Sequence, residues 1–581
     1  MIFFNRYNLT LIWIVSCLLC LGACDRDKKA PAEEHGEESA QAEVSSAIES
    51  LHDEVEPGSV EPEDLGPKAP AVFFLTGLNG YTEPCGCTAD VLLGGIDRIT
   101  GYIEAARNLH PAVALVDGGD IFFGEKHLDE HMHAQERAKA NLLAAAHREM
   151  GTVMTVPGEL DFALGTDFYL EKLEEAGIEP IAGNLKIGDR TLKGSHTATI
   201  GNLTVGFIGV VQPDLYDDIE GIEVSDEEPS ILIEIETLRG KVDAVVLVYH
   251  GELGRAKAIV EQYDGAIDFV IIGHGPRETD QVDKVGDGHT LEAYDQGRYL
   301  GVLKLYPQGE RRYRKYTNAL AGSKAEAETL ERQIDHVRQS LERIAPVEDE
   351  AEVPPMVVTL RERLANLEER KAAIEQAELE LPENESAFIY RPVAMIPGFP
   401  LHEGIHEKRL AFNRSLQELN ADIDREPIPV VDGEPFFVGT QECALCHGAA
   451  RDFWETTAHS KAVATLEARD KAFDQNCIGC HVVGWEKPGG SVLGKLRYEA
   501  ELGEHTITKD LRNVGCESCH GPGSAHRLAP LDASGSPQHI IARPEADQCT
   551  QCHVQEHSPR FDFETYVHRV TGEGHKYSGG P

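Results

Sequence analysis

The sequence predicts an α/β domain, then a helical hairpin, and then a region made mainly of short helices and loops. Three observations lead to this prediction. Between residues 70 and 318, short β-branched runs alternate with amphipathic segments, which is the pattern of a layered α/β domain. Two heptad-spaced segments follow within residues 322–382. From residue 438 to 581 regular periodicity is weak, and the motif CxxCH occurs four times.

The length and the charge of the chain limit its partners. A chain of 581 residues is long enough for two or three domains with their own cores. Its formal net charge is −45, so nucleic acids and anionic membrane surfaces would repel it. We therefore expect no nucleic-acid partner.

The first residues resemble a bacterial export signal. Arg6 precedes the apolar run LTLIWIVSCLLC, which is too short for a comfortable membrane span. The run ends in LGAC at residues 21–24, which resembles a lipobox, so residues 1–23 would be removed and Cys24 would carry a lipid. An ordinary cleaved signal or a short core segment is the alternative. The lipobox predicts a periplasm-facing lipoprotein of the bacterial cell envelope, in either the inner or the outer membrane.

The segment after this signal and the α/β part differ sharply in composition. Residues 24–69 are rich in Glu, Pro, Ala and Ser, so they bury too little apolar surface to fold and we expect an acidic flexible tether. In residues 70–318 the runs suited to buried strands are AVFFLT, AVALVD, TVGFIGVV and DAVVLVYH. The stretches 133–149 and 227–239 lie between such runs and predict helices.

The segment 322–382 carries two apolar seams that are separated by prolines. We expect an antiparallel helical hairpin that serves as a structural spacer. Residues 383–437 form a connecting region without an informative pattern. The seam residues are Ala327, Leu330, Ile334, Val337, Leu341 and Ile344, and then Leu360, Leu364, Leu367, Ile374 and Leu381.

Four CxxCH motifs lie close together in the last part of the chain. Each motif supplies two thiols for the vinyl groups of one haem and an adjacent histidine for its iron. The motifs therefore predict four covalent haem c groups within residues 438–581; a zinc site is the alternative for a single motif. The thioether cysteines are Cys443, Cys446, Cys477, Cys480, Cys516, Cys519, Cys549 and Cys552, and the proximal histidines are His447, His481, His520 and His553.

The absence of methionine limits the candidates for the second axial ligand of each haem iron. No methionine follows Met395, so methionine ligation within this domain is excluded. Two histidines on one iron imply a low potential, and a haem without a second ligand would have an open site. The histidines outside the motifs are His459, His505, His526, His539, His557, His568 and His575.

The haem segment also resembles a known family. FVGTQECALCHGAARDFWETTAHSKA, NCIGCHVVGW, NVGCESCHGPGSAH and CHVQEHSPRFDF resemble tetrahaem cytochromes of the type that accepts electrons from hydroxylamine oxidoreductase. The resemblance covers nearly all of residues 438–581. It implies that His459 and His526 are distal ligands, with His557 and His575 as further candidates. It also implies an electron carrier with redox proteins as partners, and one haem of that family can be five-coordinate.

Six motifs between residues 70 and 305 resemble, in the same order, the 5′-nucleotidase branch of the calcineurin-like metallophosphoesterases. They are GGIDR, VDGGD, GELDFALG, YHGELG, IIGHGP and QGRYLG. The resemblance implies a sandwich of two sheets flanked by helices, with metal ligands on loops at the strand ends. Such enzymes use two divalent ions and a histidine for the leaving group.

The metal ligands of that family are only partly present. Asp120 matches the bridging aspartate, and His250 and His274 match two histidines of one metal. Three ligands would hold a single divalent ion; a vestigial site is the alternative, and we favour it. The replaced positions are Gly77 and Asn79 for the first Asp-x-His, Pro157 and Gly158 for the Asn-His of GNHE, and Pro276 for the second His of GHxH.

Cys85 and Cys87 follow the first of these altered loops. The signal, the lipid site and the haem motifs account for the other eleven of the 13 cysteines, so within one chain these two can pair only with each other. A Cys-Gly-Cys disulfide closes a tight ring and should be reducible. Some nucleotidase-like relatives carry a Cys- or selenocysteine-Gly-Cys pair here, and this chain resembles the all-cysteine form. We favour a redox or soft-metal role; free thiols or a local staple are the alternatives.

These patterns together predict a membrane-anchored, extracytoplasmic tetrahaem electron-transfer protein with a degenerate phosphoesterase-like domain. Two other functions stay open. An active metal-dependent phosphoesterase or 5′-nucleotidase fused to a cytochrome would release phosphate from a nucleotide. A haem reductase of a small nitrogen or sulfur species would need an open haem site. The small-molecule substrate, if the protein has one, is unknown.

Overall fold

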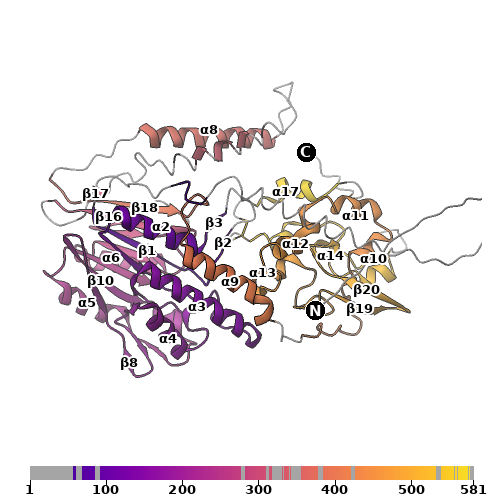
Figure 1. The fold of residues 1–581 in the computed structure, drawn as a ribbon, viewed down its shortest axis with the longest axis horizontal. Coiled ribbons are helices and arrows are strands. Elements are labelled where there is room, and N and C mark those ends of the chain that lie inside the picture. The colour runs from indigo at the N-terminus through magenta and orange to yellow at the C-terminus, as the bar shows by residue number, and fades with distance from the viewer. Residues whose placement is uncertain are drawn as a thin grey trace, which may run out of the picture.

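The computed structural model shows two lobes side by side, one built on two β-sheets and one on short helices (Figure 1). The predicted α/β class is thereby confirmed. The predicted signal segment, Cys24, most of the predicted tether and Cys87 lie outside the described residues, and of Cys85 only the backbone is described. The structure describes residues 57–60, 69–85, 92–276, 282–308, 313, 315–316, parts of 327–341, 355–376, 384–420, 425–530, 538–554, 557–558, 561–572 and 575.

The first sheet has seven strands, and its central strands are parallel. β1, β4, β5 and β6 run in one direction, whereas β16 is antiparallel to β1 and β18 is antiparallel to β16. Every residue of β1 is buried, as expected for a strand that is covered on both faces. The strand order is β17 (Lys315–Tyr316), β18 (Ala387–Ala394), β16 (Tyr299–Tyr306), β1 (Ala71–Leu75), β4 (Val113–Asp117), β5 (Thr152–Thr155) and β6 (Glu179–Pro180).

The second sheet has six strands and packs face to face against the first. Side chains alternate along its strands: Val205 and Phe207 join the core between the sheets, whereas Ile208 and Val210 join a second core under helices α5 (Glu227–Leu238) and α6 (Leu253–Gln262). This period of two is what a strand imposes. The order is β14 (Asp283–Val285), β15 (Gly288–Leu291), β13 (Phe269–Ile272), β12 (Ala244–His250), β10 (Leu203–Val211) and β9 (Ser195–Ile200).

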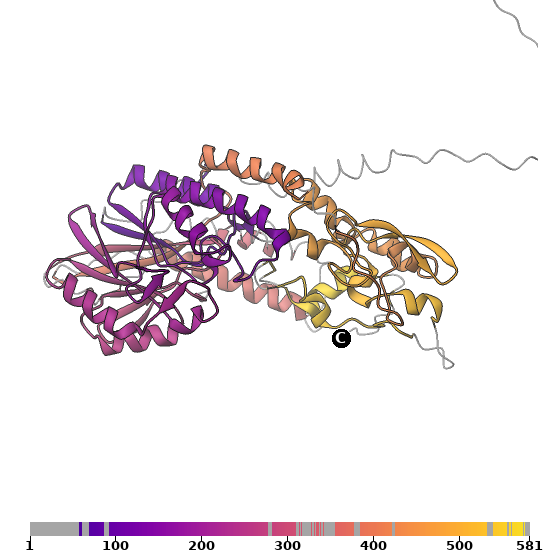
Figure 2. The same ribbon diagram turned by 90° about the horizontal axis from the view of Figure 1, so that it is seen from below.

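Helices cover the outer side of the first sheet (Figures 1 and 2). They are α2 (Ile96–Leu109), α3 (His133–Met150), α4 (Thr166–Ala176) and α9 (Glu403–Leu419), and α3 packs against the other three. Residues 383–437, which the sequence left as a connecting region, supply both β18 and α9 to this lobe. The remaining short strands are β2 (Pro84–Cys85), β3 (Leu93–Gly94), β7 (Leu185–Ile187), β8 (Arg190–Thr191) and β11 (Ile222–Val224).

The heptad segments pack as a pair. The described seam residues of the first segment form one apolar cluster with those of helix α8 (Pro355–Gln376). Arg338 pairs with Glu368 and Lys371 lies 3.6 Å from Glu331, so residue numbers rise along one segment while they fall along the other. The two segments are therefore antiparallel. Among the described residues, no helix is both long and apolar enough to cross a lipid bilayer.

The second lobe is built of short helices and one β-hairpin, and its apolar clusters of buried residues are small. Each CxxCH motif begins in a short helix. Small clusters are what we expect if bound haems fill much of the interior. The elements are α10 (Thr440–Ala444), α11 (Gly448–Trp454), α12 (Ala462–Glu467), α13 (Gln475–Ile478), β19 (Arg497–Leu502), β20 (His505–Asp510), α14 (Cys516–His520), α15 (Ser524–Leu528), α16 (Ala546–Cys549) and α17 (Phe563–Val570).

A buried polar network joins the two lobes. The Gln135 amide on α3 donates to Asp474 at 2.9 Å, and its oxygen accepts from the Asn420 side chain at 3.0 Å and from the Gln475 backbone at 3.1 Å. Gln135 is fully buried. A buried network of hydrogen bonds favours one relative placement of its partners.

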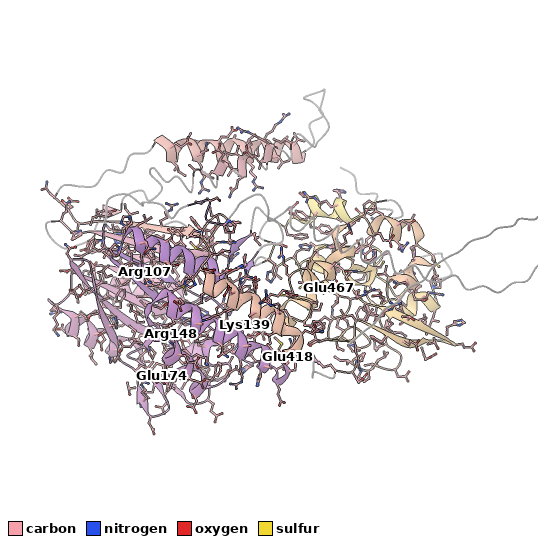
Figure 3. The ribbon with its side chains drawn as sticks, viewed as in Figure 1. Arg107, Lys139, Arg148, Glu174, Glu418 and Glu467 are labelled. Atoms are coloured by element: carbon pink, nitrogen blue, oxygen red, sulfur yellow. The ribbon has the colours of Figure 1, made fainter. Side chains whose placement is uncertain are left out.

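The network extends along α3. Asn476 donates to Glu136 at 2.8 Å, and Lys139 pairs with the same carboxylate at 2.7 Å. Lys139 is labelled in Figure 3, in the middle of the molecule. Its charge also helps to lower the pKa of Asp474, although burial acts in the opposite direction.

Ion pairs around Asp474 also contribute to the contact between the two lobes. The Glu83 carboxylate accepts from Arg409 and, at 2.8 Å, from Asn413. Lys471 of the second lobe lies 3.6 Å from Glu83 and 3.0 Å from Asp474. One lysine thus bridges a carboxylate from each lobe.

We expect this contact to be sensitive to acid. Burial raises the pKa of Glu83, but Lys471 and Arg409 lower it overall, from 4.5 to about 2. A carboxyl with a depressed folded-state pKa contributes stability above its unfolded pKa and loses it as the pH falls. The contribution of Glu83 should therefore disappear between pH 4.5 and about 2. Because the side chain is 29% exposed, we expect a contribution of only about 1 kcal/mol.

Thermal unfolding of wild type, Glu83→Gln and Glu104→Gln across this pH range tests the expectation. Glu104 is exposed on α2 and serves as the matched control. Glu83→Gln should unfold at a lower temperature at pH 7 and lose less stability on acidification than wild type does. An acid response of Glu83→Gln as steep as that of the control would contradict the assignment.

Candidate functional site

Four side chains converge at the carboxyl ends of parallel strands in the first lobe. Asp120 follows β4, Glu159 follows β5, His250 ends β12 and His274 follows β13. Their ligand atoms all lie within 4.8 Å of one another. The structure thus brings together the three predicted ligands and adds Glu159, which the sequence reasoning missed.

The contacts within the cluster place Glu159 between the two imidazoles. His250 Nε2 lies 2.7 Å from Glu159 Oε2 and 3.4 Å from Asp120 Oδ2. His274 Nδ1 lies 3.2 Å from Glu159 Oε1. His250 Nδ1 donates to the Gly118 carbonyl at 2.7 Å, which directs Nε2 toward the carboxylates.

Local backbone geometry explains how Asp120 reaches this position. Asp120 has a φ of 57° and follows Gly119 with a φ of 99°. Its Oδ1 accepts from the Leu160 backbone at 3.0 Å. A Cβ at Gly158 would lie 2.0 Å from that oxygen. The glycine that replaces the family's histidine is therefore required by this placement of Asp120.

The electrostatics of the cluster favour a positive charge at its centre. Burial raises the pKa of Asp120 to about 7, against the opposing effect of His250. Burial lowers the pKa of His250, but Asp120 and Glu159 raise it overall to about 9. The pKa of Glu159 falls because the hydrogen bond with His250 and the charges of both histidines outweigh the effect of burial. Three of the four side chains are buried, so a cation with nitrogen and oxygen ligands suits the cluster.

The side that would hold a second metal lacks ligands. Gly77 and Gly158 have no side chain, and Pro157 has no donor. A Cβ at Gly77 would meet the Asp295 side chain at 3.5 Å. Asn79 Oδ1 is buried and has no hydrogen-bond partner among the described residues. These residues do not fit the family's two-metal centre.

In the second lobe, two histidine pairs have the spacing of ligands that share one iron. The rings of His447 and His526 have centroids 6.4 Å apart, and those of His459 and His553 are 6.2 Å apart. An iron bound to one nitrogen of each ring at about 2 Å would hold the centroids roughly 6 Å apart. These pairs therefore fit haem.

The other two predicted distal histidines lie near the two remaining motifs. Burial and the charge of His557 lower the pKa of His481. Burial and then the charges of His520 and His447 lower the pKa of His575. His557 therefore lies near the second motif, and His575 lies near the first and third motifs.

Hydrogen bonds at Nδ1 orient several of these histidines. His481 contacts the Ala462 carbonyl at 2.6 Å, His520 the Ile541 carbonyl at 2.7 Å, and His526 the Gln538 carbonyl at 2.9 Å. A carbonyl accepts only, so Nδ1 carries the proton and Nε2 is left for the iron. This is the second interaction that metal-bound histidines usually make.

The four motifs also lie close to one another. Cys443 of the first motif lies close to Cys516 of the third, and Cys480 of the second lies close to Cys552 of the fourth. Burial and then Cys549 raise the pKa of the Cys519 thiol, which brings the third motif near the fourth. Neighbouring motifs are thus arranged in the order first, third, fourth and second.

Comparisons with known proteins support two separate likenesses. Residues 442–521 match the family model of cytochrome c554 and c-prime. Cytochrome c-554 of Nitrosomonas europaea is 33% identical over 146 residues, and the match covers 20% of this chain and 57% of that protein. The chain thus spans little more than half the length of this curated relative.

The solved structures that resemble the chain include two from Thermus thermophilus. A 5′-nucleotidase precursor is 13% identical, with a TM-score of 0.40 and coverage of 79% of this chain and 92% of that one. The sulfate thiohydrolase SoxB is 14% identical, with a TM-score of 0.42 and coverage of 63% and 64%. The likeness to cytochrome c554 and c-prime thus lies in the second lobe, within residues 442–521.

Proposed function

We propose that this protein is a tetrahaem electron carrier of the bacterial cell envelope, exported to face the periplasm and anchored by a lipid on Cys24. The observation that carries the proposal is the spacing of the histidine pairs, 6.2 and 6.4 Å between ring centroids. A motif histidine and a second histidine from elsewhere in the lobe form each pair, as ligation from both sides of one iron requires. Haem supplies one-electron chemistry when bound.

The arrangement of the motifs supports a single route for electrons. Contacts between attachment cysteines join the first motif to the third and the second motif to the fourth. Cys549 raises the pKa of the Cys519 thiol, which indicates that the fourth motif lies near the third. The second motif stands at the end of this order, and Asp474 of the interlobe network lies next to its Cys477. The route therefore ends against the phosphoesterase-like lobe.

The residues just before the Cys-Gly-Cys pair lie near the second haem motif, where the proposed electron route ends. The Tyr81 ring lies 6.2 Å from the ring of His557. Glu83, two residues before Cys85, pairs with Lys471, which also contacts Asp474. We propose that Cys85 and Cys87 exchange electrons with the haem of the second motif. Two electrons from the haems and two protons from solvent would convert one disulfide into two thiols.

The first prediction from this proposal concerns the number of haems per chain. The mature chain should carry four covalent haems, because each CxxCH supplies both thioether links. Mass spectrometry of the denatured protein measures the number directly. Replacing Cys549 and Cys552 with alanine should lower it by one. A wild-type count of two or fewer would remove the basis of the proposal.

The second prediction concerns axial ligation. His526→Ala should convert one haem from low-spin and six-coordinate to high-spin, because no methionine in the domain can replace the lost ligand. Absorption and electron paramagnetic resonance spectra report the spin state. His505→Ala, on the exposed face of β20, is the matched control and should leave the spectra unchanged. Identical spectra for His526→Ala and the control would exclude His526 as a ligand.

The third prediction concerns the cysteine pair. Reducing the haems should expose two alkylatable thiols at Cys85 and Cys87, and Cys85→Ser should abolish the response while four haems stay attached. Thiol labelling of the oxidised and reduced protein, read by peptide mass, measures this. Full labelling of both cysteines in oxidised, metal-free protein would show that they are two free thiols.

A further inference from the structure

We infer that Glu159 has become a metal ligand, so that the phosphoesterase-like lobe binds a single first-row divalent cation. The ligands would be the carboxylates of Asp120 and Glu159 and the imidazoles of His250 and His274. The family pattern has an Asn-His directly before this glutamate, and here that pair is Pro157-Gly158. Glu159 supplies a donor where the pattern has lost one.

The distances within the cluster suit ligands of one ion. Ligand atoms at about 2 Å from a tetrahedral cation are roughly 3.3 Å apart. His274 Nδ1 lies 3.2 Å from Glu159 Oε1, and His250 Nε2 lies 3.4 Å from Asp120 Oδ2. His250 Nε2 is closer to Glu159, at 2.7 Å, which is a hydrogen bond that the ion would replace.

Surrounding groups already orient the ligands. His250 Nδ1 donates to the Gly118 carbonyl, which fixes the ring as a metal-binding histidine requires. His274 Nδ1 is buried and makes no hydrogen bond to any described residue, although Glu159 is close. A buried ring nitrogen that faces a carboxylate without hydrogen-bond geometry is suited to binding a cation between them.

The same contacts limit the site to one ion. Asp120 Oδ1 is held by the Leu160 backbone and packs against Gly158, so Oδ2 is the oxygen directed at the cluster. A second ion would have Gly77, Asn79 and Pro157 as neighbours, and of these only the asparagine offers a donor. One ion rather than two is therefore the expected loading.

The donor set narrows the kind of cation. Two imidazole nitrogens and two carboxylate oxygens suit Zn²⁺, Mn²⁺ or Fe²⁺, whereas Mg²⁺ and Ca²⁺ prefer oxygen ligands throughout and Cu⁺ prefers sulfur. Zn²⁺ and Mn²⁺ are the probes of choice, because they bind without oxidation during a titration.

Metal titration of the chelator-treated, haem-loaded protein tests the inference. Calorimetry with Zn²⁺ and electron paramagnetic resonance with Mn²⁺ should both show one ion per chain at this site. Glu159→Gln keeps the shape of the side chain and should weaken binding on the order of 10- to 100-fold. Glu149→Gln, exposed at the end of α3, is the matched control and should bind as wild type.

Two further measurements separate metal binding at the cluster from binding elsewhere and from loss of the fold. Histidines elsewhere also bind Zn²⁺, so the double variant His250→Ala and His274→Ala defines which binding belongs to the cluster. Thermal unfolding in the presence of chelator shows whether each variant folds, and His274→Ala, at a half-buried residue, replaces Glu159→Gln if the latter does not. Two ions at the cluster, none in wild type, or equal affinity in Glu159→Gln and the control would each overturn the inference.

Discussion

The centre of the first lobe depends on one buried carboxylate. Asp161 is fully buried and accepts backbone N–H groups from Asp120, Ile121, Phe122 and Gly158 at 2.8 to 3.1 Å. Burial raises its pKa to about 6, although these bonds act in the opposite direction. Because a buried carboxylate must find donors, Asp161 draws the loop after β4 and the turn after β5 onto a common point. The positions of Asp120 and Glu159 both follow from this.

This arrangement explains how the lobe can hold its fold without the full ligand set of a two-metal centre. The core between the two sheets is apolar and continuous, so the burial of apolar surface stabilises it. The ligand loops are held by Asp161 and by backbone bonds such as that from Gly77 to the Gly119 carbonyl. Substitutions at metal positions therefore leave the framework intact, and new side chains at the strand ends can acquire other roles.

The sequence predicted what local patterns encode and missed what depends on distant partners. The buried strand runs, the haem motifs and the three ligand candidates are all local signals. Glu159 could have been found, because it directly follows the altered Pro157-Gly158, but its role depends on a side-chain direction that only the fold sets. β18 escaped detection because the residues that it pairs with in β16 lie 81 to 95 positions earlier in the chain. Gln135 looks like an ordinary polar residue on an amphipathic helix and is fully buried.

The polar contact between the two lobes, which the sequence did not predict, matters most for the proposed function. An apolar contact between lobes would allow several packing arrangements, whereas each polar group of Gln135 and Asp474 must meet a particular partner. The contact residues come from both lobes, and those of the second lobe include residues of α13, the helix in which the second haem motif begins. A contact that tolerates one arrangement holds the second motif at a fixed place beside the residues that lead to Cys85. The first lobe thus places Tyr81 beside His557 and Glu83 beside Lys471 of the second lobe.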